Sequence, residues 1–246
     1  RTDVMKAFFK KWWHGLLALY TFIYMPCFLY LERHVTEETG FHAIHCALDD
    51  HIPFVEYFII PYYSWFIFMA FFIIYFFIRS QGECVRIGAA LIIGMSIAVI
   101  IYFVFPNGLA DFRPETFPRD NFCTDLVKLL HKADTPTNVL PSLHVYNTLV
   151  IEFAVFNSKT FGRHKKKVCI ITAIWGLLIC VSTVFLKQHS VYDVLAAIVL
   201  AAIIYPITYK TKFFKKIHSL QNMFYTYCLQ KVVIYTFLKC IAIFAF

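Results

Sequence analysis

The chain has 246 residues, of which 60% are hydrophobic, 19% are aromatic and only 15% are charged. Soluble domains usually carry about 25% charged and about 45–50% apolar residues, so this composition argues against a soluble fold and favours a protein embedded in lipid. The net charge of +8 indicates a nucleic-acid surface only if the basic residues cluster on one face of a soluble domain.

Six apolar segments have the composition of membrane-crossing helices. A helical span needs about 20 mostly apolar residues, and five of the segments approach or exceed that length. The fourth is short and carries Glu152. We therefore expect an all-α integral membrane bundle of six transmembrane helices. In chain order, the predicted helices are Gly15–Leu31, Phe54–Ile78, Ile87–Phe105, Leu143–Phe156, Val168–Leu186 and Val191–Tyr209.

The two ends of the chain are expected to flank this bundle. The first apolar segment follows Lys10, Lys11 and two tryptophans without a small-residue cleavage site, which predicts a start-anchor helix and not a signal peptide. Residues 217–246 end in a short apolar stretch that holds Lys239, and we interpret them as an interfacial tail or a segment packed on the bundle. Residues 1–246 are expected to form a single membrane domain.

The distribution of basic residues predicts the orientation of the bundle. Fifteen Lys and Arg residues lie before the first helix, between the second and third, between the fourth and fifth, and after the sixth, whereas six lie on the opposite side. Because cytoplasmic loops are enriched in Lys and Arg, both termini are predicted to be cytoplasmic, in a multi-pass protein of the cell membrane. The basic excess is therefore a topology signal with some contact to anionic lipids, and no nucleic-acid partner is expected.

Three polar segments fall on the extracytoplasmic side, where packing alone does not explain them. In chain order they are Asp111-Phe112-Arg113-Pro114, Pro141-Ser142-Leu143-His144 and Lys187-Gln188-His189-Ser190-Val191-Tyr192-Asp193. In the second segment, Ser142 can cap the fourth helix, whose free N–H groups then suit a phosphate, and His144 can face the same anion. A capped helix with an interfacial histidine is the alternative interpretation of that segment.

The third segment carries the chemistry of a nucleophile. His189 and Asp193 are four residues apart, so they share one face of a helix. A carboxylate within reach of one imidazole N–H fixes the tautomer and leaves the other nitrogen free to attack. Lys187 and Arg113 can each supply positive charge to a phosphoryl group.

Together these segments resemble the three motifs of the PAP2 (type 2 phosphatidic acid phosphatase) superfamily, which are Lys-x6-Arg-Pro, Pro-Ser-Gly-His and Ser-Arg-x5-His-x3-Asp. Arg113-Pro114 matches the end of the first motif, and Pro141-Ser142-Leu143-His144 matches the second with Leu in place of Gly. Ser182, His189 and Asp193 match the third motif. The six-helix layout also resembles the family over most of the chain.

The resemblance implies a role for each matching residue. His189 would be the nucleophile that forms a phosphohistidine, and Asp193 would orient it. His144 would protonate the leaving alkoxide and then activate water. Arg113, Ser142 and the backbone N–H of Leu143 would hold the phosphoryl oxygens. The family implies no metal and no cofactor, and a lipid phosphate or phospholipid as substrate.

Two departures from the family motifs affect the expected reaction. The Lys of the first motif falls on Pro106 and the Arg of the third falls on Thr183, so Lys187 is the expected substitute cation. The Pro-Ser-Leu-His and Lys-Gln-His combinations resemble the branch that includes fungal inositol phosphorylceramide synthases, which transfer a phospho-headgroup to a lipid hydroxyl. The acceptor, water or a lipid, is therefore left open.

Three functions are compatible with the sequence. The first is a lipid phosphatase that acts on phosphatidic acid, phosphatidylglycerophosphate or a polyprenyl diphosphate. The second is a lipid phosphotransferase. The third is a transporter or scaffold that retains the fold without catalysis, which the presence of His144, His189 and Asp193 argues against.

Other polar residues have less specific interpretations. Asp49, Asp50 and His51 are expected to form a solvated helix start, with a lining of the headgroup entrance as the alternative. Glu152 lies eight residues after His144 and is a candidate support of the site from within the bundle.

The long loop over residues 107–140 is a candidate region for substrate selectivity. Within it, Thr124–Lys132 is expected to form a short interfacial helix. Cys46 and Cys123 both lie on the extracytoplasmic side, so a disulfide between them is considered, although no spacing rule supports it.

Overall fold

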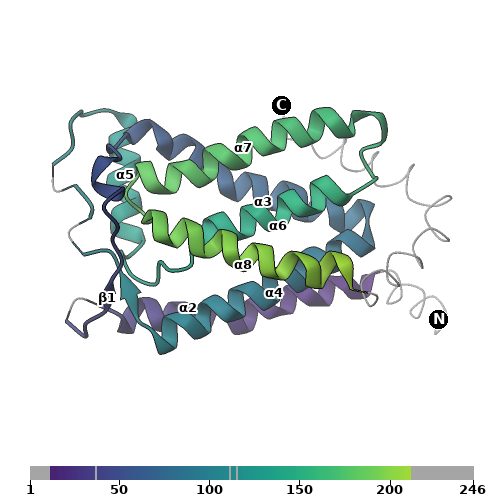
Figure 1. Cartoon of the computed structure of the whole chain (residues 1–246), viewed down its shortest axis with the longest axis horizontal. Helices are drawn as coiled ribbons and strands as arrows, with labels where there is room; N and C mark the ends of the chain where they lie inside the picture. The colour runs from purple at the N-terminus through teal and green to yellow at the C-terminus, as the bar shows by residue number, and fades with distance from the viewer. Residues whose placement is uncertain (1–11, 37, 111, 115, 212–246) are drawn as a thin grey trace, which may run out of the picture.

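The computed structural model describes residues 12–36, 38–110, 112–114 and 116–211 of the chain. Asp111 and the expected tail over 217–246 lie outside the described residues. The described chain is mainly helical, with long helices that run side by side as a bundle (Figure 1). The long helices are α2 (Thr21–His34, preceded by the 3-10 helix η1, Trp13–Tyr20), α3 (Ile59–Arg79), α4 (Gln81–Val104), α6 (Leu143–Asn157), α7 (Lys165–Phe185) and α8 (Val191–Lys210).

Five of the predicted spans are helices long and apolar enough to cross a membrane. They cover His14–His34, Glu56–Arg79, Gln81–Val104, Gly162–Phe185 and Val191–Lys210. The remaining predicted span is helix α6, which has 15 residues and is therefore shorter than the others. Helix α6 packs against α3, α4, α7 and α8, and more than half of its residues are buried.

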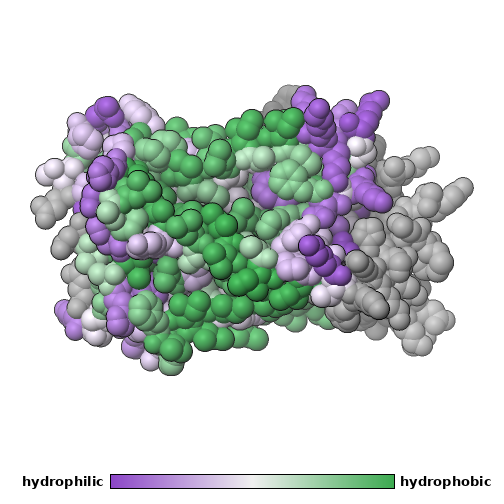
Figure 2. Space-filling model, viewed as in Figure 1, coloured by the Kyte–Doolittle hydropathy of each residue, from purple (hydrophilic) through white to green (hydrophobic). Residues whose placement is uncertain are grey.

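Large apolar side chains cover the outside of the bundle. Phe22 is 77% exposed, Phe103 is 67% exposed and Leu177 is 63% exposed, values that a soluble protein avoids over such an extended surface. Figure 2 shows that the hydrophobic surface occupies the middle of the molecule and that hydrophilic residues gather at both ends. This arrangement suits a protein whose middle is surrounded by hydrocarbon.

Helix α4 begins earlier than the sequence predicted, at Gln81 and not at Ile87. Ser80 caps it by accepting a hydrogen bond from the Glu83 N–H, which satisfies one of the free donors of the first turn. Arg86, expected in the preceding loop, is therefore helical. It is buried, and it donates to Glu83 Oε1 at 2.8 Å.

The described residues of the three polar segments named above meet at one end of the bundle, on the left in Figure 1. Strand β1 (His42–Ala43) pairs in parallel with β2 (Asn107–Gly108), which joins the α2–α3 loop to the α4–α5 loop. The expected short helix is confirmed as α5 (Phe122–Ala133), which starts where Asn121 Oδ1 accepts from the Thr124 N–H. The short 3-10 helices are η2 (Asp49–His51), η3 (Glu56–Phe58) and η4 (Gly162–His164).

The side chain of Asn107 connects this end to the start of α6. Its Oδ1 accepts from the N–H groups of Val139 and Leu140 at 2.9 and 2.8 Å. The residues that follow are the Pro141–His144 motif, so its position is fixed from the α4–α5 loop. Cys46 and Cys123 are both free in the structure, and no disulfide joins them.

Candidate active site

The start of α6 is built as the sequence predicted. Ser142 is its N-cap, and its Oγ accepts from the Val145 N–H at 3.4 Å. Because α6 starts at Leu143, the first N–H groups have no acceptor within the helix and point out of its end. The Ser142 N–H donates to the Asp193 carbonyl oxygen at 3.1 Å, which brings the second and third motifs into direct contact.

His189 and Asp193 are in contact as predicted, but for a different reason. Helix α8 begins at Val191, so His189 precedes the helix and does not share a helical face with Asp193. Asp193 instead completes a capping box: its Oδ2 accepts from the Ser190 N–H at 2.8 Å. The same oxygen lies 3.2 Å from His189 Nδ1, so the capping interaction places the carboxylate beside the imidazole.

The two histidines face each other across the site. The ring centres of His144 and His189 are 6.0 Å apart, with the planes inclined by 60°. The His144 ring packs against Tyr62 and Trp65 of α3, with ring centres 4.7 and 4.5 Å away. His189 is only 7% exposed and His144 is partly buried, so the site is partly shielded from bulk water.

Arg113 reaches the site from the α4–α5 loop. Its Nη1 donates to the carbonyl oxygens of His131 and Asp134 at 3.1 and 2.7 Å, and its Nη2 donates to Gln188 Oε1 at 2.8 Å. The carbonyls belong to the end of α5, where a cation is favoured by the helix dipole. Burial lowers the pKa of the guanidinium, and the Asp134 carboxylate opposes that shift.

Two buried donors of the hydrogen-bonded pair Arg113 and Gln188 have no protein partner among the described residues. They are Arg113 Nε and Gln188 Nε2. Buried donors are almost always hydrogen-bonded in folded proteins. These two N–H groups are therefore suited to hydrogen-bond an acceptor that a ligand brings. A phosphoryl oxygen is an acceptor of that kind.

Lys187 lies at the edge of the same site and is held by the α2–α3 loop. Its Nζ donates to the Asp49 carbonyl oxygen at 2.7 Å and lies 4.8 Å from the centre of the Phe112 ring. Burial lowers the pKa of the ammonium group, and the nearby Asp49 and Asp50 carboxylates oppose that shift. An ammonium group has three N–H donors, so the Asp49 carbonyl leaves two for other acceptors.

A family model of the PAP2 superfamily matches residues 85–217, which is more than half of the chain. The chain belongs to the PAP2 superfamily. No curated protein and no solved structure matches the chain. PAP2 proteins are phosphatases and phosphotransferases that act on phosphorylated substrates. Together with the apolar helices, membership makes the chain a membrane enzyme of the phosphatase type.

The two PAP2 positions that lack their cation have structural roles here. The carbonyl oxygen of Thr183 accepts from the N–H groups of Gln188 and His189 at 2.9 and 3.1 Å, so this position holds the residues around His189 through its backbone. The carbonyl oxygen of Pro106 accepts from the His42 N–H at 2.8 Å and extends the pairing of β1 with β2. Neither position supplies a charge to the site.

The sequence interpretation missed the environment of Asp49. It was expected in a solvated helix start, but its side chain is fully buried and accepts from Ser190 Oγ and from the Val191 N–H. Asp50, next to it, is exposed as expected and pairs with His45. The contacts of Asp49 join residues about 140 positions apart, and no local pattern indicates such a contact.

Asp134 and His131 were also missed, although both lie in the loop expected to shape the site. Burial raises the pKa of the Asp134 carboxyl, while the positive charge of Arg113 opposes that shift. Burial, and then the charge of Arg113, lowers the pKa of His131 to about 4. His131 is therefore neutral at physiological pH.

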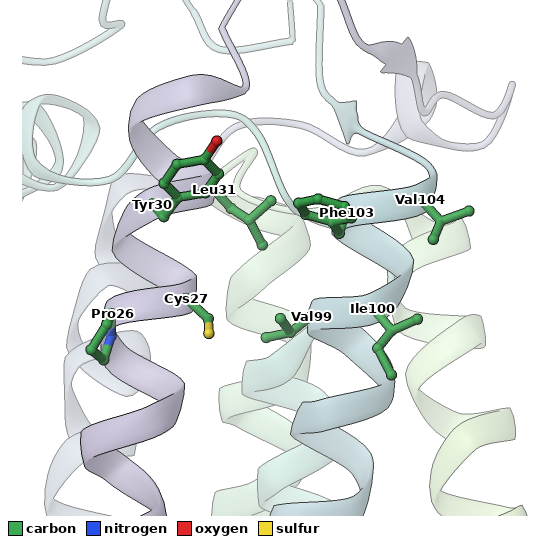
Figure 3. Close-up of a pocket in the computed structure, with 8 residues that line it drawn as sticks. All are labelled: Pro26, Cys27, Tyr30, Leu31, Val99, Ile100, Phe103 and Val104. Carbon is green, nitrogen blue, oxygen red and sulfur yellow. The ribbon is translucent and has the colours of Figure 1, made fainter.

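Two apolar grooves open on the surface of the bundle. One, of about 410 Å³, lies between α2 and α4 and contains no group suited to phosphoryl transfer (Figure 3). The other, of about 540 Å³, is lined partly by Leu140 and Tyr192, which are the sequence neighbours of Pro141 and Asp193. Among the described residues, no cluster of three or more His, Cys, Asp or Glu side chains is placed to hold a metal ion.

Proposed function

We propose that the chain is a membrane lipid phosphatase that hydrolyses a lipid phosphate through a phosphohistidine intermediate on His189. The proposal rests mainly on one observation: His189 is bonded to a buried carboxylate, and a second imidazole, that of His144, lies 6.0 Å away. Such a pair separates the nucleophile from the group that moves protons.

The proposed reaction has two steps. With its Nδ1–H donated to Asp193, His189 keeps the Nε2 lone pair, which attacks phosphorus as the ester P–O bond breaks. His144, in its protonated form, gives a proton to the leaving alkoxide. In the second step the neutral His144 removes a proton from water as the water oxygen bonds to phosphorus. The P–N bond then breaks, which releases phosphate and restores both histidines.

The phosphoryl oxygens have a set of donors around them in this proposal. Arg113 offers its unpaired Nε, and the first turn of α6 offers the N–H of Leu143 beside the cap residue Ser142. Lys187 adds a positive charge beside the nucleophile. Charge that develops on the equatorial oxygens in the transition state is stabilised by such fixed donors.

We place the site on the extracytoplasmic side of the cell membrane, in one membrane domain with six spans and both termini in the cytoplasm. Helix α6 is proposed as the sixth span because it packs against α3, α4, α7 and α8, and each of these four helices is long and apolar enough to cross a membrane. The basic residues at the start of α7 and the end of α8 lie at the end of the bundle away from the histidines, as the positive-inside rule expects.

A lipid substrate is supported by the groove next to the motifs. Its lining is mainly apolar and includes Leu195 and Val199 of α8, so an acyl or polyprenyl chain would replace hydrocarbon contacts there without a polar penalty. The lining also includes Leu140 and Tyr192, the sequence neighbours of Pro141 and Asp193. A lipid tail in this groove would bring its headgroup to the two histidines.

A lipid phosphotransferase is the second candidate, favoured by a specific departure from the family. The absence of the family cations at Pro106 and Thr183 weakens the stabilisation of a doubly charged phosphomonoester. A phosphodiester carries one negative charge and needs fewer cations. In that case a lipid hydroxyl would take the place of water in the second step.

Turnover of labelled lipids distinguishes these functions. Purified protein is incubated with phosphatidic acid, phosphatidylglycerophosphate, a polyprenyl diphosphate and phosphodiester lipids, with and without an acceptor lipid. Label released into water supports the phosphatase, and label on the acceptor supports the phosphotransferase. Lipid turnover equal to that of wild type in His189→Ala would contradict both, because the activity would then not come from His189, and no turnover of any lipid by the wild-type protein would favour a non-catalytic protein.

A further inference from the structure

The loop between α2 and α3 is hydrogen-bonded to the His189 segment, residues 187–191, on both sides of the histidine. Before His189, Lys187 Nζ donates to the Asp49 carbonyl oxygen at 2.7 Å. After it, Asp49 Oδ2 accepts from Ser190 Oγ and Asp49 Oδ1 accepts from the Val191 N–H at 2.9 Å. One residue of the loop is therefore bonded to residues on either side of the imidazole.

We propose that Asp49 is a positioning residue for the nucleophile, acting through Ser190 and Asp193; this rests on the function proposed above. The Ser190 N–H donates to Asp193 Oδ2 at 2.8 Å, and the same oxygen lies 3.2 Å from His189 Nδ1. Any movement of Ser190 therefore moves the carboxylate that orients the imidazole. Asp49 fixes the Ser190 hydroxyl and the next N–H, which removes that freedom.

The surroundings of Asp49 exceed what a surface turn needs. Its side chain is 0% exposed, and it also accepts from the Cys46 N–H at 2.9 Å. Burial raises the pKa of its carboxyl, but the hydrogen bonds from Ser190, Val191 and Cys46 together hold the pKa below its ordinary value. A buried carboxylate is stable only with such partners, so these hydrogen bonds hold the Asp49 side chain in one position.

The adjacent Asp50 provides a matched control. It belongs to the same short helix η2 and carries the same charge, but its side chain is 65% exposed and pairs only with His45 among the described residues. Substitution at Asp50 removes the same charge from the same loop but breaks none of the hydrogen bonds between Asp49 and Lys187, Ser190 or Val191. A comparison of the two positions therefore isolates the contacts of Asp49.

The first test compares Asp49→Ala and Asp49→Asn with Asp50→Ala and Asp50→Asn in the full chain. With phosphatidic acid in detergent micelles, Asp49→Ala should lower kcat by about 10–100-fold and change KM by less than about twofold, because a small misplacement of a reacting group has this effect on rate. Asp49→Asn keeps an oxygen for the Val191 N–H and should recover part of that loss. Both Asp50 variants should remain close to wild type.

A purely structural role of Asp49 gives a different pattern. In that case Asp49→Ala lowers the unfolding temperature and the yield of folded protein, while kcat per folded molecule stays equal to that of Asp50→Ala. Binding of orthovanadate, which mimics a phosphoryl group on an imidazole nitrogen, gives the same comparison without a lipid. Vanadate affinity should fall in Asp49→Ala and not in Asp50→Ala.

A double-substitution cycle tests the route through Ser190. If Asp49 acts through the Ser190 hydroxyl, Asp49→Ala combined with Ser190→Ala should lower kcat about as much as the more damaging single variant, and the effects should not add. Fully additive losses, or an Asp49→Ala variant with the kcat and vanadate affinity of Asp50→Ala, would overturn the inference. Turnover retained in His189→Ala would instead overturn the proposed function, so the two failures are distinguishable.

Discussion

The two histidines of the site differ in their surroundings, and this difference is the basis for assigning them different roles. His189 has a carboxylate partner at 3.2 Å, whereas among the described residues the ring nitrogens of His144 make no hydrogen bond to protein. The aromatic rings of Tyr62 and Trp65 fix the plane of His144 without taking its protons. An imidazole held in this way is free to exchange protons with the leaving group and with water.

Substitutions at His189 and at its partner Asp193 should have different effects, because one removes the proposed nucleophile and the other only the group that orients it. His189→Ala should abolish turnover, because His189 is the proposed acceptor of the phosphoryl group. Asp193→Asn should lower kcat by about 10³–10⁴-fold and leave a residual rate, as expected when the amide favours the wrong imidazole tautomer. Equal activity of Asp193→Asn and wild type in a labelled-lipid assay would show that Asp193 does not orient the nucleophile.

Arg113 should be sensitive to a change that keeps its charge. Lysine lacks the planar guanidinium, whose two terminal nitrogens reach the end of α5 and Gln188 separately and whose Nε remains for a ligand. The Arg113→Lys variant should therefore lose about 2–4 kcal/mol of transition-state stabilisation, measured as a fall in kcat/KM. The measurement is steady-state kinetics with the best lipid of the panel.

Lys187→Ala should also lose about 2–4 kcal/mol of transition-state stabilisation, because it removes a positive charge proposed to lie beside the phosphoryl group. A kcat/KM close to that of wild type would exclude Lys187 from the site.

His131 should make stability depend on pH. Its pKa is about 4 in the folded state and 6.5 in the unfolded state, so the unfolded chain binds the proton first as pH falls. Stability should therefore be lost as pH falls from about 6.5 to about 4. Thermal unfolding in detergent across this range measures the slope, and His131→Gln should flatten it. An unchanged slope in that variant would assign the dependence to another group.

At the scale of elements, the side chain of Asn107 joins β2 to the segment before α6, in addition to the backbone hydrogen bond from the Asn138 N–H to the Asn107 carbonyl oxygen. Asn107→Ala removes the acceptor of the Val139 and Leu140 N–H groups, which are buried or nearly so. A buried donor without a partner costs about 1–3 kcal/mol, so the variant should unfold at a lower temperature. An unfolding temperature equal to that of wild type in scanning calorimetry would mean that the other hydrogen bonds of this region, such as that of the Ser142 N–H to the Asp193 carbonyl oxygen, are sufficient to hold the start of α6.

The elements that the sequence predicted are those with a local cause. The caps Ser142, Ser190 and Asn121 lie next to the helices they start, and hydrophobic length indicates the spans. The predicted contact of His189 with Asp193 is confirmed, although a capping box produces it. The buried state of Asp49 was not predictable, because its partners lie far away in sequence and acidic residues before a helix are usually solvated.

At the scale of the molecule, the apolar middle and the hydrophilic ends suit a chain that crosses a bilayer, and the proposed orientation can be tested by labelling. In a variant without natural cysteines, Glu38→Cys lies in an exposed part of the α2–α3 loop and Lys166→Cys in an exposed part of α7. A membrane-impermeant maleimide should label the first in intact cells and the second only after permeabilisation. Labelling of Lys166→Cys in intact cells would reverse the proposed topology.

The identity of the phosphorylated residue tests the central claim most directly. Wild-type protein is incubated briefly with lipid labelled in its phosphate, quenched in alkali to preserve phosphohistidine, digested and mapped. The label should be found on His189, should be absent from His189→Ala, and should accumulate in His144→Ala if the phosphoenzyme still forms, because its hydrolysis is slowed. Label on His144, or equal turnover without any labelled histidine, would contradict the account.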